Sequence, residues 1–269
     1  MNTVRRLARR VLPDGAQRLL RSLIARGQAM RPAHQFSFAT APVHAPRSAF
    51  PFLVNTENLL EALGAKYAPS KRDHNYLVYY WMHFRDIRLD VRSVLEIGVG
   101  TGSSLCLWEE FFPNAVIHGI DVDPRCRTLE GERRRIFIGD QGDHRFLEQV
   151  ITQASSAFDI IIDDGSHRPD DQLQAFECLF PAMSDHGVYA IEDTGMGDGL
   201  RTVNALKAVV DHVMYWPSGY PPRDWPYLSE LPREAGWLAR HVIGIAYYRW
   251  IVFVMRGRNP QDNPFLHST

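Results

Sequence analysis

Cysteine is scarce in this 269-residue sequence: there are three, well separated, at positions 106, 126 and 178. Isolated cysteines without metal-ligand spacing exclude a disulfide framework, and they favour a reducing compartment, so we expect a cytoplasmic protein. Long apolar runs are also missing, and none reaches the roughly 20 residues that cross a membrane. The net charge of −1 gives no argument for nucleic-acid binding, and the chain has no internal repeat or low-complexity tract.

The charge is unevenly distributed along the chain. Residues 1–31 contain eight arginines and one acidic residue, Asp14, whereas the rest of the chain is acidic. Valine, leucine and isoleucine at helical spacing accompany the arginines, which predicts a basic helical extension. This helix suits packing on the acidic body or on a partner; the other interpretations are an interfacial membrane helix and an organellar targeting peptide. Prolines across 32–52 indicate a linker, so we expect an extension over 1–52 and a domain over 53–269.

From about residue 55 helices and strands alternate. Two aromatic-rich helical segments within 53–92 form a predicted N-terminal cap, and the predicted core covers 93–256. Short apolar strands separated by helices predict an α/β fold: a Rossmann-like, doubly wound parallel sheet with helices on both faces. Residues 241–257 have no helix between their two apolar halves, which predicts an antiparallel hairpin that turns near Tyr248 and Arg249.

Polar side chains follow each predicted strand at the point where it ends. They are Glu96, Asp121, Asp140, Asp164 with His167, and Glu192 with Asp193. Ligands of doubly wound sheets bind at the carboxyl ends of the strands. Five polar clusters on one edge therefore predict a ligand site there.

The stretch LEIGVGTGSS predicts a cofactor loop. Its glycines let the backbone approach a ligand closely, but the GxGxxG pattern of dinucleotide-binding proteins fails at its last glycine. Glu96 suits a ligand ammonium group, Asp121 suits two ribose hydroxyls, and Asp140 with Gln141 suits an adenine amino group. S-adenosylmethionine carries all three groups. The expected cofactor-binding residues are Glu96, Gly98, Gly100, Thr101, Gly102, Asp121, Asp140 and Gln141.

The ends of two later strands predict a metal site. Asp164 ends one strand and the pair Glu192 and Asp193 ends the next, so three carboxylates would meet and repel unless a cation neutralises them. Oxygen ligands favour a hard ion, with Mg²⁺ first and Mn²⁺ or Ca²⁺ as alternatives. Asp163 starts toward the opposite face of its strand and receives no role. Histidine titrates near neutral pH, so His167 is the expected general base, although lone strand-end histidines and aspartates are often caps or surface residues.

These motifs carry a family resemblance. The glycine loop, followed by GIDVDP and IGDQGD, resembles the class I S-adenosylmethionine-dependent methyltransferases, which implies seven strands with an antiparallel last one. IDDGSH, YAIEDT, GDQGD and KRDHNY resemble the metal-dependent macrolide sugar O-methyltransferases over roughly residues 65–256. That resemblance implies Mg²⁺ on Asp164, Glu192 and Asp193, with His167 as the base.

The expected function is Mg²⁺-dependent methyl transfer from S-adenosylmethionine to a hydroxyl of a sugar or glycosylated natural product. The alternatives are a catechol-like acceptor, an NAD(P)-dependent oxidoreductase, and a non-catalytic S-adenosylmethionine-binding subunit. Aromatic residues after the fifth strand suit an acceptor surface or the apolar underside of a loop: Trp216, Tyr220, Trp225, Tyr227 and Trp237. Lys71, His74 and Tyr76 suit the cofactor mouth, with His74 as a helix cap the alternative. The sequence leaves the oligomeric state open, a homo-oligomer included.

Overall fold

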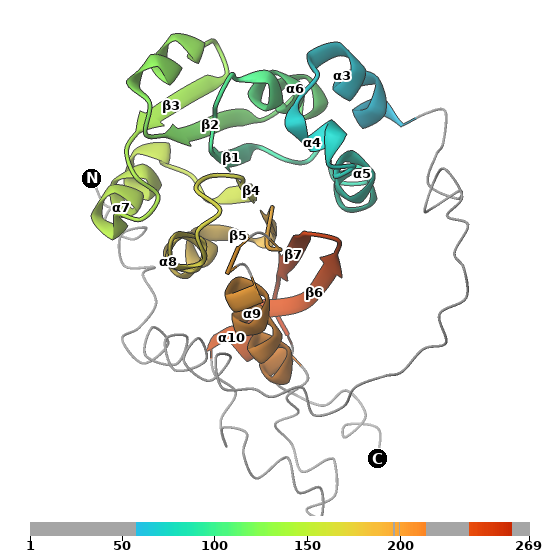
Figure 1. Cartoon of the computed structure of the whole chain (residues 1–269), viewed down its shortest axis with the longest axis vertical. Coiled ribbons are helices and arrows are strands. Elements are labelled where there is room, and N and C mark those ends of the chain that lie inside the picture. Colours follow the sequence, from blue (N-terminus) through green and yellow to red (C-terminus); the bar gives the residue numbers. More distant parts are fainter. Residues whose placement is uncertain (1–57, 196, 199, 214–236, 260–269) are drawn as a thin grey trace, which may run out of the picture.

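Seven strands form one mixed sheet at the centre of the molecule (Figure 1). The computed structural model describes residues 58–195, 197, 198, 200–213 and 237–259. The strand order is β3-β2-β1-β4-β5-β7-β6. The strands are β1 (Ser93–Ile97), β2 (Val116–Asp121), β3 (Arg134–Ile138), β4 (Phe158–Asp163), β5 (Met183–Ile191), β6 (Val242–Tyr248) and β7 (Ile251–Arg256).

The first five strands are parallel, and β7 runs antiparallel to both of its neighbours, β5 and β6. This topology confirms the predicted doubly wound α/β fold with a terminal antiparallel hairpin. The hairpin turns at Arg249 and Trp250, next to the predicted position. The predicted basic extension and linker, residues 1–52, lie outside the described residues.

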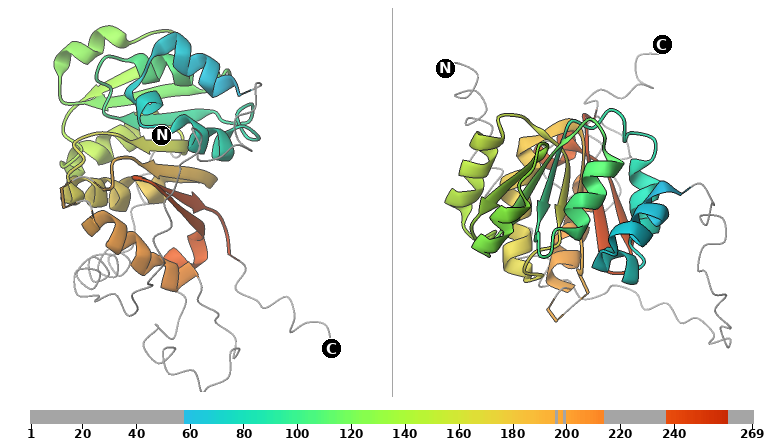
Figure 2. Two further views of the ribbon diagram at one scale, coloured as in Figure 1. Left: turned by 45° about the vertical axis from the view of Figure 1, so that its right-hand side comes forward. Right: turned by 90° about the horizontal axis from the view of Figure 1, so that it is seen from above.

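Helices cover both faces of the sheet (Figure 2). On one face lie α3 (Leu59–Tyr67), α5 (Leu77–Phe84) and α6 (Ser103–Phe111), and on the other lie α7 (His144–Ala154), α8 (Pro169–Leu179) and α9 (Leu200–Val213). The remaining short elements are α4 (Ser70–Asp73), α10 (Trp237–His241), and the 3-10 helices η2 (Pro124–Leu129) and η3 (Phe180–Ala182). Because both faces are covered, β1 is buried at all five positions, as parallel strands require.

Alternation along the strands divides the core into two hydrophobic clusters. Val94 and Ile162 pack under α5 and α6, whereas Leu95 and Ile161 pack under α7 and α8. The same period of two carries on into the polar residues that end each strand. It therefore decides which face of the sheet each predicted site residue meets.

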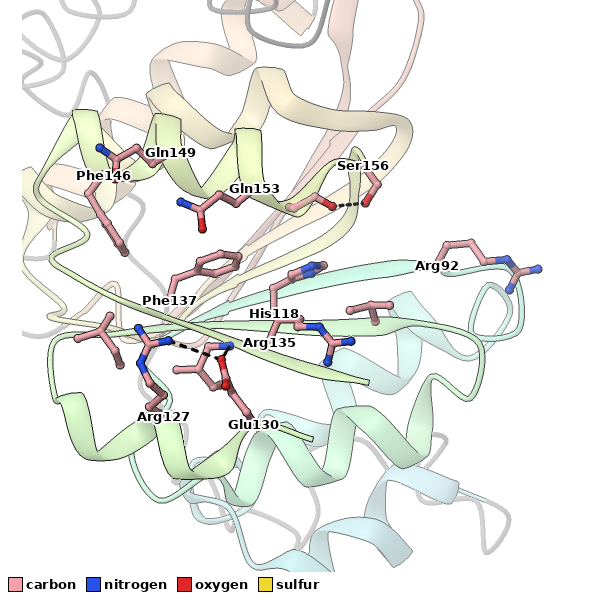
Figure 3. Close-up of a pocket in the computed structure, with 14 residues that line it drawn as sticks. Arg92, His118, Arg127, Glu130, Arg135, Phe137, Phe146, Gln149, Gln153 and Ser156 are labelled. Atoms are coloured by element: carbon pink, nitrogen blue, oxygen red, sulfur yellow. Dashed lines mark hydrogen bonds and ion pairs between the residues drawn. The ribbon is translucent and has the colours of Figure 1, made fainter. Parts of the chain in front are cut away.

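Within the described ranges, no helix combines the length and the apolar character needed to cross a bilayer. A cavity of about 610 Å³ opens beside the edge strand β3, between that strand and α7 (Figure 3). Arg92, His118, Arg135, Phe137 and Gln153 line it, together with residues of η2 and α7. None of the predicted cofactor, metal or catalytic residues is among its lining residues, so this cavity is separate from the site described below.

Candidate active site

The glycine loop after β1 meets the backbone of the neighbouring strand end at Gly98, where there is no room for a side chain. Gly98 has a φ of +89°, and a Cβ atom on it would lie 2.1 Å from the backbone oxygen of Asp164. The loop thus packs directly on the end of β4. One carboxylate oxygen of Asp121, Oδ2, accepts hydrogen bonds from the backbone N–H groups of Val99 and Gly100, both at 2.9 Å. The end of β2 therefore fixes the loop that the sequence assigns to the cofactor.

The predicted cofactor residues have different surroundings. Thr101 is exposed, and its hydroxyl lies 3.0 Å from that of Ser103. Asp140 is exposed and accepts a hydrogen bond from the N–H of Gly142. Glu96, in contrast, is fully buried, with Oε2 accepting from the Ser104 hydroxyl at 2.8 Å. The structure brings the loop, Asp121 and Asp140 to the carboxyl edge, and it places Glu96 beneath that edge.

Asp163 and Asp164 point to opposite faces of the sheet, as the period of two predicts. Asp163 is fully buried on the α7 and α8 face, where Gln141 Nε2 donates to its Oδ1 at 3.1 Å. The carbonyl oxygen of the same Gln141 side chain accepts from the N–H of Ser166 at 2.7 Å. Burial raises the pKa of Asp163 to about 7. Asp163 thus has a structural partner, and it ties the end of β4 to the loop after β3.

Asp164, His167 and Asp193 form a group that could hold a metal ion. One donor atom from each lies within 4.8 Å of the other two. His167 Nε2 is 3.6 Å from Asp193 Oδ2, and its other nitrogen, Nδ1, is buried without a hydrogen-bond partner in the part of the chain described. His167 and Asp193 also have positive φ values, 56° and 55°. Backbone strain of this kind concentrates at functional sites.

Glu192 faces a different set of partners. Its Oε1 accepts from the Tyr80 hydroxyl at 2.5 Å and lies 2.8 Å from Lys71 Nζ. Burial raises the pKa of Glu192, and the Lys71 ammonium opposes that shift. The structure therefore brings Asp164 and Asp193 together with His167, and it places Glu192 beside that group but outside it.

Two tyrosines at α5 contact the carboxylates that follow β5. The sequence suited Tyr76 to the cofactor mouth and did not single out Tyr80. Tyr76, which precedes the helix, donates to Asp193 Oδ1 at 2.6 Å, and Tyr80 donates to Glu192. The two tyrosines are four residues apart, so they lie on one helix face. Burial raises the pKa of both phenols, so both remain hydrogen-bond donors. In the sequence, two tyrosines four residues apart at the start of an apolar helix were the pattern from which these contacts could have been predicted.

Two further predicted residues can be placed. His74 does not cap α5; its Nδ1 lies 3.7 Å from Asp193 Oδ1, on the site side. Trp237 packs in the hydrophobic cluster of the α8 face and stacks on His241, with ring centroids 4.2 Å apart. These contacts support the interpretation of Trp237 as an apolar packing residue and not as part of an acceptor surface. The other four aromatic residues of the expected acceptor segment lie outside the described residues.

Known proteins resemble this chain in both sequence and fold. Mycinamicin VI 2''-O-methyltransferase of Micromonospora griseorubida is 33% identical over 208 residues, which cover 70% of this chain and 49% of that protein. A solved structure of MycE, a methyltransferase from the mycinamycin biosynthetic pathway in complex with Mg, SAH and mycinamycin VI, matches with a TM-score of 0.63 and 32% identity. That match covers 74% of this chain and 53% of MycE. The chain belongs to the class I methyltransferases.

Demethylmacrocin O-methyltransferase of Streptomyces fradiae is also similar to this methyltransferase. It is 31% identical over 212 residues, which cover 70% of this chain and 50% of that protein. No family model matches the sequence. The chain spans about half the length of these curated relatives. The comparisons confirm the predicted resemblance to sugar O-methyltransferases of macrolide pathways.

Proposed function

We propose that this protein transfers a methyl group from S-adenosylmethionine to a hydroxyl of a sugar or glycosylated natural product, with Mg²⁺ as the metal. The observation that carries the proposal is the group of Asp164, His167 and Asp193 beside the glycine loop. Sugar O-methyltransferases among the relatives, and MycE in complex with Mg and SAH, support the same chemistry. We further propose residues 53–92 as a cap on a core domain of residues 93–256.

The residues at the carboxyl edge fit a hard divalent cation. Asp164 and Asp193 offer carboxylate oxygens, which Mg²⁺ prefers, and both side chains keep only part of their surface in solvent. Glu192 completes the proposed ligand set through its second oxygen, because Oε1 is held by Tyr80 and Lys71. The glycine loop with Asp121 and Asp140 is the proposed cofactor-binding surface. Glu96 supports it from below, and Gln141 supports it through its hydrogen bonds to Asp163 and Ser166.

Each bound group would supply one kind of chemistry: S-adenosylmethionine an electrophilic methyl group, and Mg²⁺ a positive charge that favours ionisation of the acceptor hydroxyl. His167 accepts the hydroxyl proton. Nε2 is the atom for this task, because Nδ1 is buried and the side chain as a whole is 29% exposed. Asp193, 3.6 Å from Nε2, stabilises the resulting imidazolium. Tyr76 holds Asp193 in place through its hydrogen bond.

A methyl-transfer screen with labelled cofactor tests this function. Glycosides and catechols are offered as acceptors, each with Mg²⁺ and with a chelator. We expect labelled glycoside only when Mg²⁺ is present. Label on catechols alone would favour the catechol alternative, and transfer that survives chelation would contradict the metal assignment. Thermal stabilisation by NAD instead of S-adenosylmethionine would favour an oxidoreductase.

A further inference from the structure

Lys71 is a cation at the centre of the carboxylate-rich edge. It belongs to α4, and only 1% of its surface is exposed. Its Nζ lies 3.1 Å from Glu96 Oε1, 2.5 Å from Asp164 Oδ2 and 2.8 Å from Glu192 Oε1. A lysine ammonium has three N–H donors and no acceptor. Three carboxylates around it match that capacity, so the ammonium is fully engaged and held in one position.

The three partners come from three adjacent strand ends. Glu96 lies on β1, Asp164 follows β4, and Glu192 follows β5. All three point to the face covered by α5 and α6, because each is in phase with residues of that cluster, such as Val94 and Ile162. Like charges this close repel strongly where water is excluded, and a buried charge without a partner is costly. One buried cation therefore holds together the glycine-loop strand and the two strands of the proposed metal site.

Lys71 is the cation that these three carboxylates share. Glu96 also accepts from the Ser104 hydroxyl and from Trp108 Nε1, and Glu192 accepts from Tyr80. These partners are neutral donors. In contrast, Arg72, the next residue on α4, is exposed and is not part of the cluster. The charge balance of the cluster thus depends on Lys71 and not on the general basicity of α4.

We propose that Lys71 is a positioning residue of the active site. It fixes Asp164 through Oδ2, which leaves Oδ1 for the divalent ion, and it locks the glycine-loop strand to the metal-site strands through Glu96. This inference rests on the proposed function, since it assigns Asp164 to the ion. Lys71 acts through the carboxylates and does not contact the transferred methyl group.

Melting curves of Lys71→Met, with Arg72→Met as the matched control, test the inference. In a chelator we expect Lys71→Met to melt below the wild type, because two buried carboxylates and the partly buried Asp164 have lost their cation. Added MgCl₂ should raise its melting temperature more than that of the wild type, because the ion replaces the missing charge. Arg72→Met should follow the wild type in both conditions. An equal Mg²⁺-induced rise in Lys71→Met and wild type would overturn the proposal.

Kinetics separate positioning from a purely structural role. At saturating Mg²⁺ we expect kcat of Lys71→Met to fall by about tenfold or more, with the KM for S-adenosylmethionine within about threefold of the wild type. A kcat within threefold of the wild type in folded Lys71→Met would overturn the positioning role. Wild-type protein that transfers no methyl group would refute the proposed function, whereas the melting comparison would still decide the role of Lys71.

A double variant keeps the inference testable if Lys71→Met does not fold. Lys71→Met combined with Glu96→Gln removes the cation together with one of the three negative charges. We expect the double variant to be more stable than Lys71→Met alone, and to give folded protein where the single variant does not. A double variant no more stable than the single variant would show that charge balance is not what Lys71 provides.

Discussion

Replacing Asp163 by asparagine should make the protein more stable at alkaline pH and change little at acidic pH. Asp163 is fully buried, and burial raises its pKa from 3.8 to about 7. At a pH between these two pKa values, the folded protein therefore keeps a proton on Asp163 that the unfolded chain has released. Since the folded state then binds more protons, the free energy of unfolding falls as the pH rises from about 4 through 7.

The size of the effect follows from the two pKa values. A difference of about three pKa units corresponds to about 4 kcal/mol once the group is ionised in both states. Roughly 1.5 kcal/mol of this is already lost at pH 5, so a further ~2.5 kcal/mol should be lost between pH 5 and pH 8. Asparagine removes this loss and keeps an Oδ1 that can accept from Gln141 and Gly165, as Asp163 does at 3.1 and 3.4 Å.

The assay is urea unfolding at pH 5, 6, 7 and 8 in the presence of a chelator. We expect the free energy of unfolding of Asp163→Asn, relative to the wild type, to rise by about 2–3 kcal/mol from pH 5 to pH 8. Asp86→Asn is the matched control: its side chain is 81% exposed, and the wild-type pH dependence should remain. The reasoning is refuted if wild type and Asp163→Asn show parallel pH profiles.

Three further predictions concern the loop, the base and the acceptor side. Gly98→Ala should lower the melting temperature far more than Gly100→Ala, because a Cβ on Gly98 meets the Asp164 backbone at 2.1 Å whereas Gly100, also at positive φ, has nothing within 4 Å; equal losses would contradict the close packing. His167→Gln should lower kcat by about 10²–10⁴ with S-adenosylhomocysteine affinity unchanged by calorimetry, and a loss of that affinity would mean a structural role. Trp250 lies in the β6–β7 turn, where its side chain is 45% exposed and its carbonyl accepts from the Thr194 N–H at 3.0 Å. If the exposed ring contacts the acceptor, Trp250→Ala should raise the acceptor KM about tenfold in steady-state assays. An unchanged KM would exclude this contact.

The sequence predicts those parts of the site that depend on periodicity along one strand. Alternation places Asp163 and Asp164 on opposite faces, and the structure confirms it through their separate partners, Gln141 and Lys71. The alternation of elements likewise predicts the doubly wound sheet, and the absence of a helix in 241–257 predicts the final hairpin. In each case the information is local, because a period of two or a missing helix is visible within a short segment.

Contacts between distant elements could not be predicted in the same way. Lys71 and Asp164 are 93 positions apart. The sequence suited Lys71 to the cofactor mouth, but it did not predict that the Lys71 ammonium contacts the carboxylate of Asp164. Glutamine at 141 appeared suited to adenine, but its buried amide turns toward Asp163. Such details depend on how the cap helices pack across the sheet edge, which follows from the assembled core and not from any one stretch of residues.

The antiparallel course of β7 has a consequence for how this fold can diversify. Because β7 runs opposite to β5, the turn that precedes it returns to the carboxyl edge, where Trp250 adjoins the backbone of Thr194 and Gly195. Turns tolerate substitution and insertion better than buried strands. The last hairpin can therefore change its tip from one homologue to another without repacking the sheet, so the surface beside Thr194 and Gly195 can vary while the glycine loop after β1 stays the same.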